Sequence, residues 1–152
     1  MNTRLAFSLM GLITDENFET QNDCLETVKL FTQKYDWGNV LIFAIIDDEQ
    51  LQKLRQKLNY RNFHLLTYFK SENLIQCNGV HDILNKCDQY DIDYIIDTEY
   101  VTPKYWDIFT EKVCLVKFGP LPKPLSIRHP KVRYIKNFKK LRAWSCKIPA
   151  QR

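Results

Sequence analysis

The sequence predicts a three-layer α/β fold in which helices cover both faces of a mostly parallel, five-stranded sheet. Short apolar runs alternate along the chain with segments whose apolar residues recur at helical spacing. One run, residues 39–46, is apolar almost throughout, which is typical of a parallel strand buried on both faces. Strand–helix alternation of this kind implies a parallel sheet with crossover helices. We therefore expect a doubly wound, flavodoxin- or Rossmann-like architecture.

Each expected strand is an apolar run that ends at polar residues or at a turn signal. The third run, FHLLTYF, mixes aromatic and branched residues in the way that strands favour. The fourth, YIID, is short and ends on a carboxylate. The five expected strands span residues 4–13, 39–46, 63–69, 94–97 and 113–118.

The expected helices lie between these strands. Asn22 or Asp23 suits the N-cap of a first helix that continues to Tyr35, and Thr102 followed by Pro103 suits the start of a short fourth helix. The remaining helices are predicted from apolar spacing alone. They carry Leu51, Leu54 and Leu58 (ending near Asn59); Val80, Ile83, Leu84 and Cys87; and Val132, Ile135, Phe138 and Leu141.

The chain of 152 residues has the size of one domain, and we expect residues 1–152 to form a single α/β unit. Residues 119–130 contain too many prolines for a regular element. Residues 119–152 are then a basic C-terminal segment that ends in a helix. No apolar run approaches the roughly 18–20 residues that a membrane-spanning helix needs.

Cysteine usage and the N-terminal run bear on location. The five cysteines are scattered and include no CxxC pair, which argues against a disulfide framework and a zinc module. We expect a reducing, intracellular and cytoplasmic setting. Residues 4–13 also resemble a short signal peptide, but no small-x-small cleavage site follows them before Asp15. A first buried strand is the favoured interpretation, with secretion as the alternative.

Charge is distributed unevenly along the chain. Residues 1–111 hold 10 Lys/Arg and 18 Asp/Glu, a balance of −8, whereas residues 112–152 hold 12 Lys/Arg and no acid, a balance of +12. A block of one charge sign favours a polyanionic or acidic partner. Nucleic acid is the partner we expect first, because basic groups neutralise phosphates and exposed rings stack on bases. The candidate contacts are Arg128, Lys131, Arg133, Tyr134, Lys136, Lys139, Lys140, Arg142 and Trp144.

Two other interpretations of this segment stay open. In one, its aromatic residues pack the last helix on the sheet while the lysines and arginines form a solvated face. In the other, the segment binds a membrane surface or an acidic protein surface. Under the nucleic-acid interpretation, the chain is an accessory subunit of a larger assembly. No RNA- or DNA-binding sequence signature decides between them.

Acidic residues follow two of the expected strands. Asp47 and Asp48 follow the second strand, and Asp97 and Glu99 lie at the end of the fourth. Ligands of doubly wound folds bind at the carboxyl ends of strands, where carboxylates could hold Mg²⁺. These four acids are therefore a candidate metal site for a phosphotransfer or nuclease-type enzyme. The competing interpretation is that they cap helices and organise turns.

No established catalytic motif supports an enzyme. The chain lacks GxGxxG after its first strand, a phosphate-binding P-loop and a GxSxG nucleophile turn. We therefore favour a non-enzymatic α/β protein, without a required cofactor, that binds RNA or DNA through its basic C-terminal segment. The Mg²⁺-dependent enzyme is the alternative.

Overall fold

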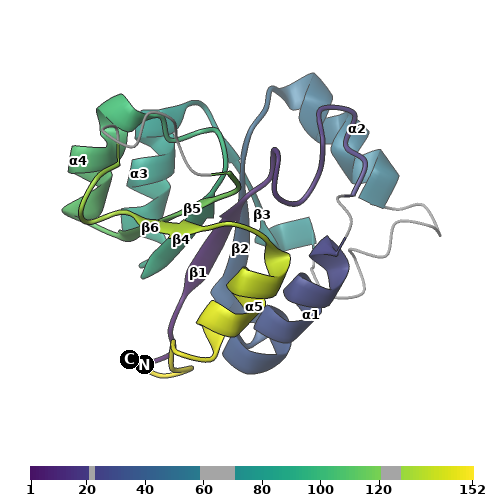
Figure 1. Ribbon diagram of the computed structural model, residues 1–152. Helices are drawn as coiled ribbons and strands as arrows, with labels where there is room; N and C mark the ends of the chain where they lie inside the picture. The colour runs from purple at the N-terminus through teal and green to yellow at the C-terminus, as the bar shows by residue number, and fades with distance from the viewer. Residues whose placement is uncertain (21–22, 59–70, 121–127) are drawn as a thin grey trace.

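The computed structural model describes residues 1–20, 23–58, 71–120 and 128–152. Strands and helices alternate through these residues, as the sequence predicts (Figure 1). The strands are β1 (Leu5–Ser8), β2 (Val40–Ile45), β3 (Leu74–Cys77), β4 (Tyr94–Asp97), β5 (Cys114–Phe118) and β6 (Arg133–Ile135). The α-helices are α1 (Cys24–Tyr35), α2 (Asp48–Leu58), α3 (Val80–Gln89), α4 (Trp106–Thr110) and α5 (Phe138–Ser145). Short 3₁₀ turns are η1 (Trp37–Asn39), η3 (Ser71–Asn73) and η4 (Pro103–Tyr105).

Within the described part of the chain, six strands form one sheet in the order β3-β2-β1-β4-β5-β6. Every neighbouring pair is parallel. The strand order reverses between β1 and β4, which is the arrangement of a doubly wound, Rossmann-like sheet. The predicted fold class is confirmed, with six strands instead of five.

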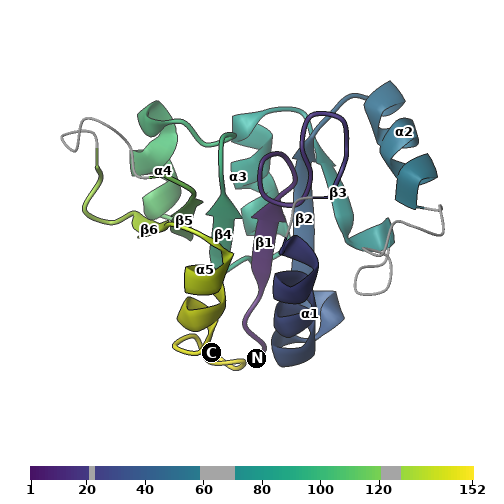
Figure 2. The same cartoon turned by 45° about the vertical axis from the view of Figure 1, so that its right-hand side comes forward.

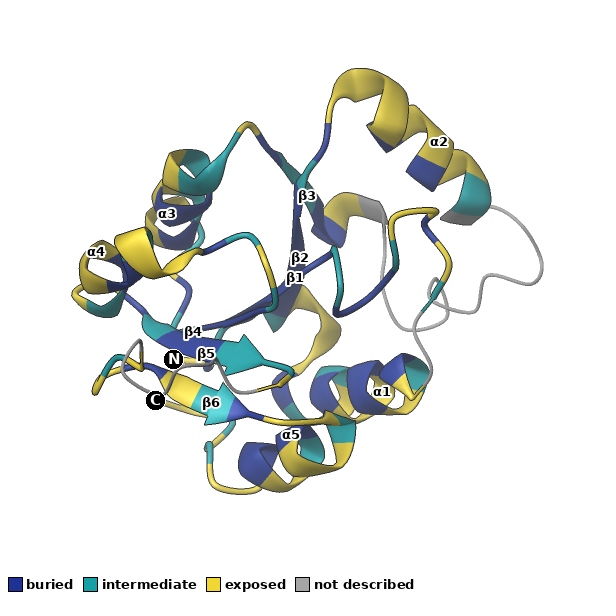
Figure 3. Cartoon of the chain, turned by 45° about the horizontal axis from the view of Figure 1, so that its top comes forward, coloured by how far each residue is buried: buried dark blue, intermediate teal, exposed yellow. Residues whose placement is uncertain are grey.

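Helices cover both faces of the sheet, and side-chain alternation along the strands explains why. In β1, Leu5 and Phe7 point into one core and Ala6 into the other. The first core also contains buried residues of α1, α2 and α5, and the second those of α3 and α4. Helices α1 and α5 lie side by side on one face (Figure 2). Figure 3 shows buried residues along the sheet and exposed ones on the outward sides of the helices.

The C-terminal helix is part of this packing. Leu141 is fully buried and Trp144 is only 7% exposed, and both belong to the core that α1 covers. The Tyr35 hydroxyl donates to the carbonyls of Ser145 and Ile148, which ties the end of α5 to α1. The chain then returns to its own beginning, where Thr3 N donates to Ala150 O at 2.9 Å. The two termini therefore lie together (Figure 1).

Three boundaries differ from those predicted. Residues 133–135, expected within the final helix, form edge strand β6, and the helix begins only at Phe138. Residues 74–77, expected as a connection, form the opposite edge strand β3. The first strand ends at Ser8, because the chain turns at Gly11, whose φ is +81°. The expected strand at residues 63–69 lies outside the described residues.

The N-terminus of α5 is capped by the side chain of Asn137. Asn137 precedes α5 in an extended conformation, and its side-chain oxygen accepts a hydrogen bond from Lys140 N at 2.9 Å. This bond satisfies one of the free N–H groups of the first turn. The cap fixes where strand β6 gives way to α5, and hence where the lysines of that turn lie.

Candidate functional site

The acids that follow β2 cap a helix. Asp47 Oδ1 accepts from Gln50 N at 2.7 Å, and Gln50 Oε1 accepts from Asp47 N at 3.0 Å, which is a reciprocal capping box. Asp48 Oδ1 accepts from the side chain of Gln76 in β3. Each of these contacts stabilises the β2–α2 turn. The position of Asp47 and Asp48 is therefore explained by hydrogen bonds within the protein.

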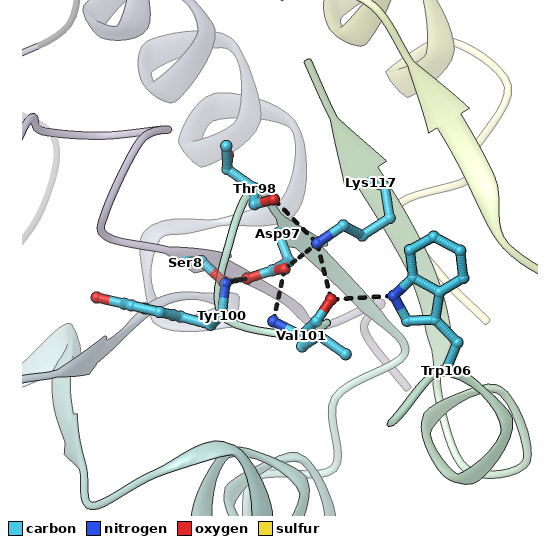
Figure 4. Close-up of polar contacts among 7 residues, drawn as sticks. All are labelled: Ser8, Asp97, Thr98, Tyr100, Val101, Trp106 and Lys117. Atoms are coloured by element: carbon cyan, nitrogen blue, oxygen red, sulfur yellow. Dashed lines mark hydrogen bonds and ion pairs between the residues drawn. The ribbon is translucent and has the colours of Figure 1, made fainter. Parts of the chain in front are cut away.

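Asp97 is fully buried at the carboxyl end of β4 and is surrounded by donors (Figure 4). Ser8 Oγ donates to its Oδ1 at 2.6 Å, from the neighbouring strand β1. The backbone N–H groups of Tyr100 and Val101 donate to the two carboxylate oxygens at 3.2 and 2.9 Å. Lys117 Nζ lies 2.5 Å from Oδ2. The carboxylate therefore fixes the turn that follows β4.

Lys117 completes this network from β5. Besides Asp97, its ammonium donates to the carbonyls of Thr98 and Val101, each at 3.0 Å. An ammonium has three donors, so all three are used. Trp106 Nε1 donates to the same Val101 carbonyl at 2.9 Å. The pair thus neutralises a buried charge and holds residues 98–101 against the ends of β4 and β5 (Figure 4).

The structure does not bring the four predicted metal ligands together. Strand β1 separates β2 from β4, and Asp97 is held by Lys117. Glu99 is exposed and forms no ion pair with another described residue. Across the described ranges, no group of three or more His, Cys, Asp and Glu side chains could hold a metal ion. The geometry therefore lends no support to the magnesium hypothesis.

The point where the strand order reverses is occupied by the chain itself. A Cβ on Gly11, in the turn after β1, would lie only 2.9 Å from Thr98 Cγ2 in the turn after β4. Tyr100 is half-buried beside these turns, and burial of its hydroxyl raises the pKa of that group to about 12. Doubly wound proteins commonly bind ligands at this position. In this protein, the turn after β1 contacts the turn after β4 at that position.

Most candidate phosphate contacts are exposed. They lie around edge strand β6 and the first turn of α5, and no ion pair joins them to an acid within the described residues. Arg142 differs, because it is half-buried and donates to Thr27 Oγ1 at 3.1 Å. The exposed set consists of Arg128, Lys131, Arg133, Lys136, Lys139 and Lys140, and we refer to these six as the basic surface.

The two aromatic candidates have different environments. Trp144 is buried, with its ring edge on Tyr94 at 5.4 Å between centroids, so it is a core residue and offers no surface for stacking. Tyr134 is half-buried: it contacts Trp106 at 6.0 Å, and its hydroxyl accepts from His129 N at 2.8 Å. Arg128 lies over the Tyr134 ring at 5.7 Å.

His129 ties the first residues of the basic surface to helix α4. Its Nε2 lies 2.6 Å from Asp107 Oδ1, and its Nδ1 accepts from Lys131 N at 3.0 Å. An accepting Nδ1 implies that Nε2 carries the proton and donates to Asp107. The carboxylate therefore orients the imidazole, and the imidazole orients the backbone of Lys131.

Two hollows adjoin Tyr134. One, of about 560 Å³, is lined by Arg128, Lys131 and Arg133. The other, of about 290 Å³, lies at the carboxyl ends of β4 and β5. The smaller hollow is lined by Lys117 and by part of the turn after β4, and the larger one is lined by three members of the basic surface.

The sequence indicated the basic surface but not the role of Ser8 and Lys117. Both lie at the carboxyl end of a parallel strand, as Asp97 does, and Asp97 is the register partner of Lys117. A polar residue near the end of each of three apolar runs was the available signal. Pairing of the strands was needed to interpret it.

Comparison with protein-family models and with curated protein sequences finds no match for this chain. No helix in residues 1–20, 23–58, 71–120 and 128–152 is both long and apolar enough to cross a membrane.

Proposed function

We propose that this protein acts by binding RNA or DNA through the basic surface, and that it serves as an accessory component of a larger assembly. The observation that supports this most is six exposed cations on one continuous stretch of chain, none paired with a described acid. Cations gathered in this way repel one another in the free protein. A polyanion removes that repulsion and releases counterions when it binds.

The first turn of α5 strengthens the proposal. The N-terminus of a helix carries a partial positive charge and favours acidic side chains. Here the first turn contains no acid, and Lys139 and Lys140 occupy it, with Lys136 just before. This arrangement is electrostatically unfavourable in the free protein. An incoming phosphate interacts favourably with the helix N-terminus and with the lysines together.

Three other basic side chains within residues 112–152 already have partners and are left out. Lys117 is bound to Asp97, and Arg142 to Thr27. Arg152 forms ion pairs with Asp91 and Asp93, each at 2.8 Å. The contrast separates cations that hold the fold together from cations that are available to a ligand.

Fluorescence anisotropy with labelled oligonucleotides of about 12 nucleotides tests the proposal, since single-strand site sizes run from roughly 4 to 16. The double variant Lys131→Gln/Arg133→Gln should bind several-fold more weakly than the parent, because two phosphate contacts are lost. The matched control is Lys29→Gln/Lys53→Gln, which removes two exposed lysines from α1 and α2. Equal weakening by both double variants would assign binding to net charge rather than to the basic surface.

An acidic protein partner is the competing outcome. If the parent protein binds neither RNA nor DNA at low salt, the nucleic-acid proposal is wrong. Affinity purification with and without nuclease then identifies the partner class, because a protein bound directly is retained after nuclease treatment.

A further inference from the structure

Tyr134 lines both hollows, and the two have opposite electrostatic character. We propose that the 290 Å³ hollow accepts one unpaired base of a single-stranded nucleic acid whose phosphates lie along the neighbouring basic surface. This inference rests on the proposed function and specifies its substrate as single-stranded. The hollow is called the base hollow below.

The charges lining the base hollow disfavour phosphate. Among the described residues that line it, the only cation is Lys117, which is neutralised by Asp97 and has no free donor. The only acid among them is Glu99, which is exposed and forms no ion pair with another described residue. A carboxylate repels phosphate but accepts hydrogen bonds from the amino and ring N–H groups of bases. The base hollow therefore favours a neutral group that can donate.

The remaining lining residues favour a flat, apolar group. Half-buried Tyr134 contributes aromatic surface, and exposed Pro103 and Pro120 contribute rigid apolar surface. Trp106 lies behind Tyr134 and is only 3% exposed, so it supports the Tyr134 ring. Base–aromatic stacking of this kind is sequence-tolerant, since every base has a π-face. Ligand pockets of drug-sized molecules begin at about 300 Å³, and a single base is smaller than such a molecule. The volume therefore suits one base.

The adjacent hollow suits the phosphate. Arg128, Lys131 and Arg133 line it, and no acid is found among the described residues around it. Tyr134 forms the boundary, held by Trp106 on one side and by His129 N at its hydroxyl. A nucleotide that crosses Tyr134 can thus place its phosphate among cations and its base beside Glu99. A base within a duplex is stacked and paired, so it cannot enter.

The first test compares a single-stranded probe with a blunt duplex of the same length and sequence, in RNA and in DNA form. A purely electrostatic surface prefers the duplex, whose charge density is higher. The inference predicts tighter binding of the single strand. A duplex that binds as tightly or more tightly overturns the inference but leaves the proposed function standing. Absence of binding to either probe overturns both.

The second test uses the sign of one mutational effect. If Glu99 only repels phosphate, Glu99→Gln tightens binding. If Glu99 accepts from a base, the same substitution weakens single-strand binding by about five- to tenfold, the value of one good base contact. Glu111→Gln is the matched control, because Glu111 is exposed and lines neither hollow. Unchanged or tighter binding by Glu99→Gln overturns the inference.

Discussion

Replacing Asp97 with Asn should destabilise the protein strongly. The substitution removes the negative charge opposite Lys117, whose side chain is only 13% exposed. It also places an NH₂ group where one carboxylate oxygen now accepts from Val101 N and Lys117 Nζ. If the amide is flipped, its NH₂ group faces Tyr100 N instead, so that two donors again face each other. Loss of one partner of a buried ion pair costs about 3–5 kcal/mol.

Urea denaturation followed by circular dichroism measures this effect. With a denaturant slope of roughly 2 kcal/mol per molar, the unfolding midpoint of Asp97→Asn should fall by about 2 M. The control is Asp91→Asn, which breaks an exposed ion pair with Arg152 and should cost less than about 1 kcal/mol. Adding Lys117→Met to Asp97→Asn should recover part of the loss, since it removes the unpaired ammonium. Equal midpoints for the Asp97 and Asp91 variants would refute the structural role of the pair.

Two further predictions concern packing. Gly11→Ala should lower the free energy of unfolding by about 1–3 kcal/mol, because φ is +81° and the new Cβ would lie 2.9 Å from Thr98 Cγ2. The control, Gly38→Ala, should not, since a Cβ there has nothing within 4 Å. Equal shifts in melting temperature for the two variants would contradict the contact between the turns. A thiol reagent should modify exposed Cys146 first in the native protein, because burial raises the pKa of Cys24, Cys77 and Cys87 to about 12 and the thiolate is the reactive form. Mass spectrometry after brief labelling reads the order, and early modification of Cys24 would show that its environment is not the one described.

The fold class could be predicted because the parallel strands are apolar on both faces. The run at 39–46 corresponds to β2, whose residues 40–44 are all buried. The edge strands β6 and β3 were harder to predict. Val132, Ile135, Phe138 and Leu141 recur every three residues, which imitates a helix, yet Ile135 ends a strand and Leu141 lies on α5. A three-residue strand at the sheet edge is too short for alternation to show.

The strand β3 illustrates a second limit. Its four residues, Leu74–Cys77, include a polar Gln76, so the run lacks the continuous apolar character that marked β2. Gln76 has a structural role, since it donates to Ile46 O and Asp48 Oδ1 and thereby ties β3 to the β2–α2 turn. Such a role depends on neighbours that are distant in sequence, and spacing alone does not reveal it.

For the candidate site, sequence patterning identified the charged residues but not which of them are engaged. Arg128 and Arg142 are both arginines of the acid-free segment, yet the first is exposed and the second is held by Thr27. Trp144 was as good a stacking candidate as Tyr134 until packing placed it in the core. Burial of one face of α5 decides both outcomes, and it follows from how α5 meets α1 and the sheet.

The most direct test of the central claim is the salt dependence of single-strand binding between about 50 and 200 mM. If all six cations of the basic surface contact phosphate, the slope of log K against log salt is roughly −4, and affinity falls about 300-fold over this range. For Lys131→Gln/Arg133→Gln the slope should fall to about −3, while Lys29→Gln/Lys53→Gln should keep the parent slope. A parent slope near zero, or one that the Lys131/Arg133 substitutions leave unchanged, would contradict phosphate binding by this surface.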